Sequence, residues 1–273
     1  MTAVVTTLDK LIAPSRHIFL SPHYDDIAIS CGGTARLLAK HDRQPIVALI
    51  FGSEPASDHQ YTAFAQRMHR DWGFDAQEVI ASRRAEEAVA SQVLGTTDQF
   101  LPFHDAIYRG ERYLGDDELF SVPANDEAAS LPAAIAEAIG LTGEANDDTR
   151  IYTPLGSGKH VDHQLAFMTG VVLANRGWEV WCYEDLPYSI KPGALDNRLA
   201  TAGVELTEAA RIDVSSVWDA KIDAIMSYPS QLETVFGRYV GAGTTRDEIS
   251  AAMRRFATTI DGEHAVERFW SVK

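Results

Sequence analysis

The chain has 273 residues, of which 45% are hydrophobic and 23% are charged, a composition typical of a globular protein with a large buried core. The formal net charge of −15 excludes nucleic acid and anionic membrane surfaces as main partners, because both require clustered positive side chains. Residues 1–14 lack the apolar segment of a signal peptide, and no apolar run is long enough to span a bilayer, so we expect a cytoplasmic protein.

The first polar cluster follows a short apolar run, residues 16–21, which reads as a buried strand. Directly after this run come one imidazole and two carboxylates, His23, Asp25 and Asp26. Adjacent carboxylates repel each other unless a cation or a shared proton relieves them, and a metal ion is the simplest relief. Because ligands of open α/β sheets bind at the carboxyl ends of the strands, the cluster predicts a ligand site.

The next segments predict alternating helices and strands. Small residues and glycines after Asp26 predict a tight turn that opens a helix over residues 34–41. The apolar run 45–52 reads as a parallel strand covered on both faces, which completes a strand-helix-strand unit. A more polar segment, residues 51–80, is expected to form a loop and a short helix across the mouth of the site.

A helix is predicted over residues 82–95, with Ser82 as its N-cap and Gly95 as its C-terminal stop. Two arginines at its start oppose the helix dipole. Arg83 is therefore a candidate oxygen clamp on a ligand, with an ion pair to a nearby glutamate as the alternative. The inward stripe of this helix is expected to be apolar: Ala85, Ala88, Val89, Val93 and Leu94.

The later segments continue the pattern, with residues 195–213 fitting an edge hairpin or a loop insert. We find no internal repeat or linker, so residues 1–273 are expected to form a single α/β domain. Its sheet is expected to be Rossmann-like and mostly parallel, with helices on both faces and the site at the C-terminal strand ends. Strands are predicted at residues 99–103, 151–155 and 179–184, and helices at 128–139, 164–175, 218–226, 231–236 and 245–259.

A second polar cluster, His160, Asp162 and His163, follows the predicted strand 151–155 and precedes a helix. The two clusters together supply histidines and aspartates at strand-to-helix junctions. A catalytic zinc needs three ligands of these types, with a fourth position left for water. The two loops therefore predict a site for Zn²⁺ or another divalent metal. Cys31 lies near the first cluster in the sequence, which leaves it open as a further ligand.

The clusters resemble the motifs of the PIG-L/LmbE-like family of zinc-dependent N-deacetylases. That family has Pro/Ala-His-Pro-Asp-Asp after its first strand and His-Pro-Asp-His further on, and the matching segments here are residues 22–26 and 160–163. Tyr24 and Val161 replace prolines without removing a polar group. Gly158 stands where some mycothiol-pathway members have a tyrosine that polarises the amide, so this chain is less similar to that branch.

The resemblance implies a role for each polar residue of the two clusters. Asp25 would be the general base. A charged His160 would stabilise the oxyanion and protonate the leaving amine, and Asp162 would orient a histidine. The metal ligands would be two histidines and one carboxylate: His23, Asp26 and His163.

The resemblance further implies a small-molecule amide substrate, an N-acetylated amino sugar or a soluble N-acetylglucosaminyl-type glycoside. Cleavage of larger amide conjugates is one alternative, which an open groove would favour. A metal-binding module without catalysis is another, which the intact Asp25 disfavours. A nucleotide-binding Rossmann protein lacks support, because no G-x-G-x-x-G follows the first strand.

Candidate contacts to sugar hydroxyls lie at strand ends and on the helix 82–95: Arg83, Asp105, Glu184, Asp185 and Tyr188. The sequence does not decide between a monomer and a homo-oligomer.

Overall fold

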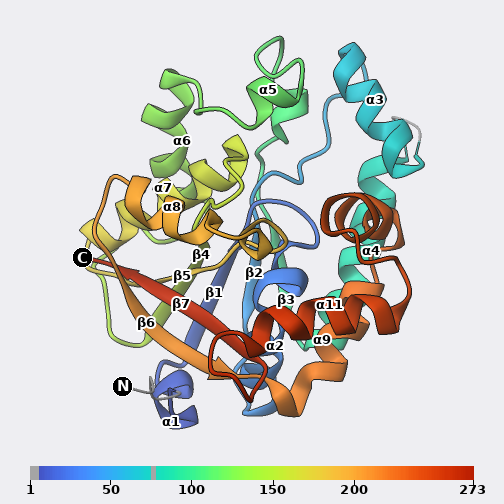
Figure 1. Cartoon of the computed structure of the whole chain (residues 1–273). Helices are drawn as coiled ribbons and strands as arrows, with labels where there is room; N and C mark the ends of the chain where they lie inside the picture. Colours follow the sequence, from blue (N-terminus) through green and yellow to red (C-terminus); the bar gives the residue numbers. More distant parts are fainter. Residues whose placement is uncertain (1–5, 75–77) are drawn as a thin grey trace.

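The computed structural model describes residues 6–74 and 78–273. Its centre is a seven-stranded sheet in the order β3-β2-β1-β4-β5-β7-β6 (Figure 1). Neighbouring strands among β1 to β5 run parallel, whereas β7 pairs antiparallel with β5 and with β6. The strands are β1 (Arg16–Ser21), β2 (Ile46–Leu49), β3 (Thr97–Phe100), β4 (Thr149–Pro154), β5 (Glu179–Tyr183), β6 (Leu206–Asp213) and β7 (Val266–Val272).

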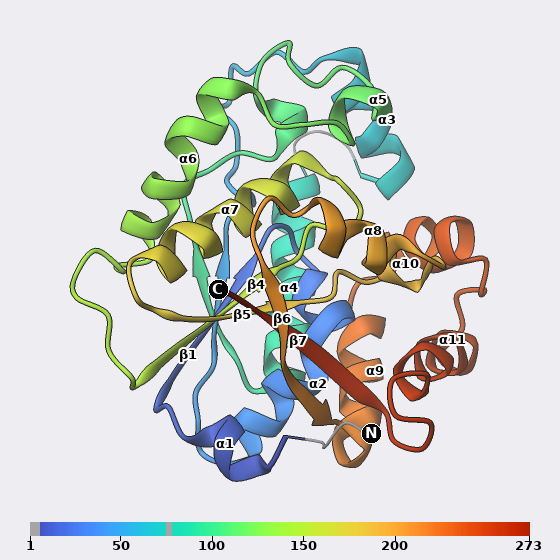
Figure 2. The same ribbon diagram turned by 60° about the vertical axis from the view of Figure 1, so that its left-hand side comes forward.

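Helices cover both faces of the sheet (Figures 1 and 2), so the predicted fold class is confirmed. Helices α2, α4, α9 and α11 contact one another on one face, and α6 packs on α7 on the other. No helix in the described ranges is both long and apolar enough to cross a membrane. The α-helices are α1 (Leu8–Ile12), α2 (Asp26–Lys40), α3 (Ala63–Trp72), α4 (Val79–Leu94), α5 (Asp116–Leu119), α6 (Asn125–Ala138), α7 (Val161–Asn175), α8 (Ala194–Thr201), α9 (Trp218–Met226), α10 (Pro229–Leu232) and α11 (Arg246–Thr258). Shorter segments are the 3₁₀ turns η1 (Ala106–Tyr108), η2 (Tyr188–Ile190) and η3 (Ser215–Val217), and the π-helical η4 (Glu233–Val240).

Successive residues of the inner strands enter two separate cores. In β1, Phe19 points into the core under α2 and α9, while Ile18 and Leu20 point into the core under α7. This alternation is expected of a strand that is covered on both faces. The ring of Tyr152 in β4 stacks on Phe19 with centroids 4.0 Å apart, which fixes β1 and β4 side by side.

Helix α2 begins at Asp26, well before residue 34, where the sequence predicted its start. The two glycines therefore lie inside the helix, and the backbone leaves helical angles at Cys31 (φ −140°, ψ 25°). The carboxylate of Glu267 in β7 compensates this break, because it accepts hydrogen bonds from the backbone N–H groups of Gly33 (3.0 Å) and Thr34 (2.7 Å). Because Glu267 is more than 200 residues away from Gly33 and Thr34 in the sequence, no local pattern could reveal this contact.

Helix α4 buries a polar face, so the predicted apolar stripe is wrong. The helix begins at Val79, which places Ser82 inside it, whereas Gly95 ends it in the left-handed conformation (φ 76°) as predicted. The polar face is buried because it packs against the loop that carries the first polar cluster. Three residues of the predicted stripe are exposed: Ala85, Ala88 and Val89. The buried positions are Val79, Ile80, Arg83, Glu86, Glu87, Ala90, Ser91 and Leu94.

The C-terminal part of the chain also differs from the prediction. Residues 195–213 contribute to α8 and the edge strand β6, and the strand that pairs with β6 is β7, which the sequence did not indicate. The free thiols Cys31 and Cys182 are both buried in the cores.

A buried ion pair joins α9 to β7 and yields the first prediction. Lys221 Nζ donates to Glu267 at 2.6 Å, and both residues are buried. Replacing Lys221 with Met leaves the Glu267 charge without its cation, so we expect the free energy of unfolding in urea to fall by about 3–5 kcal/mol. Lys273→Met, which removes an exposed ion pair with Glu205, should cost less than about 1 kcal/mol. Equal stability of Lys221→Met and the parent protein would contradict this account.

Candidate active site

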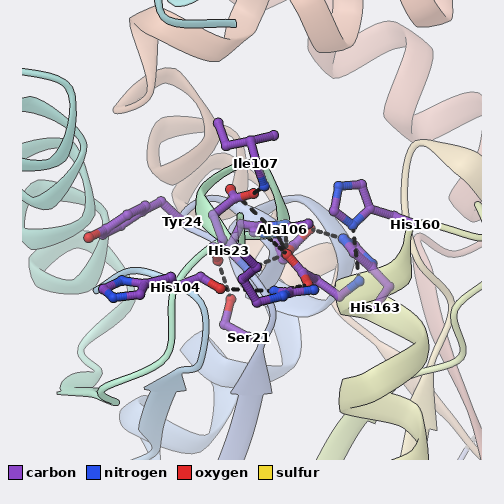
Figure 3. A network of polar contacts seen from close by, with 12 residues as sticks. Ser21, His23, Tyr24, His104, Ala106, Ile107, His160 and His163 are labelled. Atoms are coloured by element: carbon purple, nitrogen blue, oxygen red, sulfur yellow. Dashed lines mark hydrogen bonds and ion pairs between the residues drawn. The ribbon is translucent and has the colours of Figure 1, made fainter. Parts of the chain in front are cut away.

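The two polar clusters meet at the carboxyl ends of β1 and β4, which are neighbours in the sheet. Figure 3 shows His160 and His163, at the start of α7, near His23. The centroid of the His23 ring lies 5.4 Å from that of His163 and 4.8 Å from that of His160. The Asp26 carboxylate lies between the first two rings, with Oδ1 3.4 Å from His163 Nε2 and Oδ2 3.6 Å from His23 Nδ1. The fold thus brings the predicted ligand set together.

The Asp26 carboxylate lies at a metal-ligand spacing from both histidines, through a different oxygen in each case. Two zinc ligands, each about 2.0–2.2 Å from the ion, lie roughly 3.3–3.5 Å apart in tetrahedral geometry, close to the two distances made by Asp26. Each histidine also has a carboxylate at its other nitrogen: Asp185 is 2.7 Å from His163 Nδ1, and Asp162 is 2.9 Å from His23 Nε2. Such partners fix the tautomer and the ring orientation of metal-binding histidines.

Two donor groups in the described part of the chain have one ligand atom per residue, all within 4.8 Å of one another, and the predicted set is not among them. One contains His23, His160 and His163, and the other contains His23, Asp105 and Asp162. The second group is the poorer cation site, because the guanidinium of Arg109 already lies 2.7 Å from Asp162 Oδ1. The first group differs from the predicted ligand set by His160 in place of Asp26.

The pKa values in the cluster show a shortage of positive charge. Burial raises the pKa of Asp25 to about 7, although the Arg83 guanidinium opposes this effect. Burial alone would lower the pKa of His23, but the carboxylates of Asp105, Asp162 and Asp26 raise it to about 9. Both raised pKa values favour the protonated forms of His23 and Asp25, which reduces the local excess of negative charge. A bound divalent cation would offset the same excess.

Asp25 is held in an uncommon backbone conformation with its carboxylate at the pocket. Its φ is 86°, in the left-handed region. Arg83 Nη2 donates to Asp25 Oδ1 (3.2 Å) and to the carbonyl oxygen of Tyr24 (3.0 Å). Arg83 therefore holds Asp25 and does not pair with a neighbouring glutamate; Glu86 instead accepts hydrogen bonds from Ser230.

His160 occupies the N-cap position of α7. Its Nδ1 accepts a hydrogen bond from the backbone N–H of Asp162 (3.2 Å), which leaves the ring proton on Nε2. Burial, followed by the neighbouring His23, lowers the pKa of His160 well below its ordinary value. The resemblance implied a charged imidazole, whereas these surroundings hold it neutral.

These side chains line a pocket of about 290 Å³. Three of the predicted substrate contacts lie in its wall, Arg83, Asp105 and Tyr188. A Cβ at Gly158 would lie 2.3 Å from the Tyr188 ring, so the absence of a side chain there makes room for that tyrosine. The Tyr188 hydroxyl has no hydrogen-bond partner within residues 6–74 and 78–273. The apolar wall comes from α3, the α5 loop, the segment after β5 and η4: Met68, Trp72, Leu119, Phe120, Leu186 and Val235.

The structure places two predicted substrate contacts outside the pocket. Glu184 accepts hydrogen bonds from Arg268 (2.5 Å) and Trp270 (3.0 Å) of β7. Asp185 is buried and accepts from the Gly156 and Ser157 backbone as well as facing His163, so it orients a histidine and does not reach a ligand. Neighbouring segments thus engage both carboxylates: β7 binds Glu184, and the loop before α7 together with His163 binds Asp185. Cys31 lies in the core and joins neither donor group.

Sequence reasoning missed two buried polar residues behind the site, Arg109 and Glu87. Arg109 lies in a loop whose pattern gave no signal. Glu87 shares the buried face of α4 with Arg83; its Oε2 accepts from the Tyr228 hydroxyl (2.8 Å) and lies 3.4 Å from the Asp25 backbone nitrogen. The one available signal was helical spacing, since Glu87 is four positions from Arg83.

Comparison with known proteins agrees with this geometry. Residues 18–174 match the sequence model of the PIG-L family, described as GlcNAc-PI de-N-acetylase. The 2'-N-acetylparomamine deacetylase of Niallia circulans is 30% identical over 237 residues, which cover 81% of this chain and 82% of that protein. The 2'-N-acetylparomamine deacetylase of Streptomyces fradiae is 32% identical over 233 residues, covering 83% and 77%.

Solved structures with the same fold include a deacetylase from the biosynthesis pathway of teicoplanin. It superimposes with a TM-score of 0.76 at 22% identity and covers 94% of this chain and 98% of its own. The zinc-inhibited form of teicoplanin deacetylase gives a TM-score of 0.70 at 21% identity, with the same coverage. At these identities the likeness establishes the fold.

Glu87 yields a prediction about pH. Burial raises its pKa to about 8, and the Asp98 charge adds to the shift. A glutamate in the unfolded chain has a pKa of about 4.3, so between about pH 4.3 and pH 8 the folded protein binds the Glu87 proton more tightly than the unfolded chain does. The stabilising contribution of this proton is complete below about pH 4 and is lost as the pH rises through about 8. Urea denaturation at pH 5 and pH 8.5 should therefore show a smaller loss of stability for Glu87→Gln than for the parent protein.

The matched control for that experiment is Glu111→Gln, because Glu111 is exposed. This variant should follow the parent protein across the whole pH range. A Glu87→Gln variant that loses as much stability as the parent would show that Glu87 is ionised in the folded state.

Proposed function

The chain belongs to the PIG-L family, and on that premise we propose that it is a metal-dependent hydrolase that removes an N-acetyl group from an amino sugar of a small glycoside. The observation that carries the proposal is the convergence of His23, Asp26 and His163 beside Asp25, a carboxylate outside the ligand set. Zn²⁺ is the metal we propose, because two histidines and one carboxylate are ligands typical of catalytic zinc.

The chemistry follows from the residues around the pocket. A bound divalent cation would lower the pKa of a coordinated water to about 7 and polarise the amide carbonyl. Asp25, held by Arg83, takes the proton from the attacking water and returns it to the leaving amine. His160 donates its Nε2 proton as a hydrogen bond to the developing oxyanion, which a neutral imidazole can do without changing its charge.

The pocket supports a sugar substrate. Its volume of about 290 Å³ is small for a ligand site and suits one sugar ring. Four aspartates line it against one arginine, Arg83, which favours substrates with additional amino groups. The two 2'-N-acetylparomamine deacetylases point to the same class, an N-acetylated glycoside that carries further amines. We propose that the sugar hydroxyls contact Arg83, Asp105 and Tyr188.

The alternative of a larger amide conjugate has less support. A long open groove would favour it, whereas the pocket has a volume of only about 290 Å³, with apolar side chains such as Trp72 and Phe120 in its wall. A second hollow of about 410 Å³ shares Phe120 with the pocket and gives the remaining rings of a glycoside room.

The buried free thiols Cys31 and Cys182 support a reducing, cytoplasmic location.

Amine release tests the proposed function. The purified protein is incubated with 2'-N-acetylparomamine and with the methyl glycoside of N-acetylglucosamine, and free amine is measured with and without a chelator. We expect release that the chelator abolishes and Zn²⁺ restores. Release of no amine from either sugar would contradict the proposal.

Two variants separate the base from the ligands. Asp25→Asn should keep bound metal and lose about 10²–10⁴-fold in kcat, because it removes only the proton acceptor. His163→Ala should lose the metal itself, because it removes one of three ligands. Metal analysis after gel filtration and amine release measure both effects. Full turnover by Asp25→Asn would contradict the assignment of the base, and stoichiometric metal in His163→Ala would contradict the ligand set.

A further inference from the structure

Arg109 is a buried arginine that reaches the site only through another residue. Its side chain is 12% exposed and lies between the rings of Phe51 and Tyr113, with the guanidinium carbon 5.1 Å and 5.3 Å from the ring centroids. Nε and Nη2 donate to the two carboxylate oxygens of Glu127, at 3.0 Å and 3.3 Å. Nη1 takes no part in this paired contact; it donates to the carbonyl oxygen of His104 (2.9 Å) and also lies beside Asp162.

Asp162 connects Arg109 to the predicted metal ligand His23. Its side chain is fully buried, with Oδ1 2.7 Å from Arg109 Nη1. Oδ2 lies 2.9 Å from His23 Nε2 and accepts from the backbone N–H of Ala106 at 3.0 Å. A carboxylate can only accept, so it makes Nε2 of His23 the donor. The other ring nitrogen, Nδ1, then presents its lone pair on the side of Asp26.

We propose that Arg109 is a positioning residue that holds Asp162 against His23 and so fixes the ring in the tautomer that binds metal through Nδ1. The inference rests on the proposed function for its catalytic consequence, but its claim about metal binding stands on the geometry of these residues. The Asp162 carboxylate contacts His23 and the backbone N–H of Ala106, and the guanidinium of Arg109 is the permanent cation beside it. Without that cation, Asp162 would lose the ion pair that offsets its desolvation and that holds its carboxylate against His23 Nε2.

Lysine cannot replace the contacts of Arg109. Its single ammonium cannot reach both oxygens of Glu127 and also Asp162, because it lacks the planar fork of a guanidinium. Glu127 is held independently by the Tyr113 hydroxyl at 2.6 Å, so the anchor of Arg109 does not depend on the metal. Arg109, which directly follows η1, thus places a permanent positive charge behind His23 in the loop after β1.

The experiment compares Zn²⁺ affinity, measured by competition with a chromophoric chelator, in the parent protein, Arg109→Met and Arg109→Lys. Arg246→Met is the matched control, because Arg246 also contacts two carboxylates, Asp219 and Asp223, but on the surface. We expect affinity to fall by about 10–100-fold in Arg109→Met and less in Arg109→Lys, and to stay unchanged in Arg246→Met. In the Zn²⁺-loaded parent protein, long-range ¹H–¹⁵N spectra should show His23 protonated at Nε2 with slow proton exchange, which Arg109→Met should accelerate.

Parental Zn²⁺ affinity in Arg109→Met, with unchanged exchange of the His23 proton, would overturn the inference. If Arg109→Met does not fold, Arg109→Lys and Glu127→Gln, which loosens the anchor, decide by the same two readouts. A parent protein that binds Zn²⁺ but releases no amine would overturn the proposed function alone. A parent protein that binds no Zn²⁺ would overturn both.

Discussion

Compensation of negative charge inside a buried pocket is the constraint on which this structure depends. The carboxylates of Asp105, Asp162 and Asp26 raise the pKa of His23 to about 9, and burial raises the pKa of a fourth carboxyl group, Asp25, to about 7. Burial makes each of these charges costly, and mutual repulsion adds to the cost. Two fixed arginines offset part of it, and the spacing of Asp26 from two histidines leaves a place where a divalent cation can offset the rest.

The scaffold supplies these charges from elements that otherwise look ordinary. Helix α4 turns a polar face inward so that Arg83 can reach Asp25, and Glu267 of β7 holds the break in α2 that follows the first cluster. The polar face and the break would each weaken an isolated helix. They are stable here because Arg83 pairs with Asp25 and Glu267 pairs with Lys221, in each case a partner from a different segment of the chain.

The sequence predicted the features that depend on local pattern. The apolar runs located β1, β2 and β4, and polar residues after β1 and β4 had to meet because parallel neighbours end at the same edge of a sheet. Features that depend on distant partners escaped prediction. The break inside α2 is held by Glu267 of β7, and β7 itself pairs antiparallel with β5 and β6, strands that are distant from it in the sequence. The polar face of α4 was read as exposed because buried ion pairs have no periodic signature.

The site residues divide in the same way, into those that local motifs predicted and those that depend on distant partners. Residues inside the two motifs came together, whereas Glu184 and Asp185, chosen only because they are polar and end a strand, are engaged by β7 and by His163. Arg109 could not be identified from its loop sequence, since its importance lies in contacts with Glu127 and Asp162. Spacing along the chain thus located the ligands, and only the three-dimensional structure located the residues that hold them.

The most direct test of the central claim is anomalous X-ray diffraction from crystals of the parent protein grown with Zn²⁺, recorded on both sides of the zinc absorption edge. The account predicts one strong anomalous peak bonded to His23 Nδ1, Asp26 and His163 Nε2. A peak coordinated by Asp105 and Asp162, or no peak among these side chains, would contradict it.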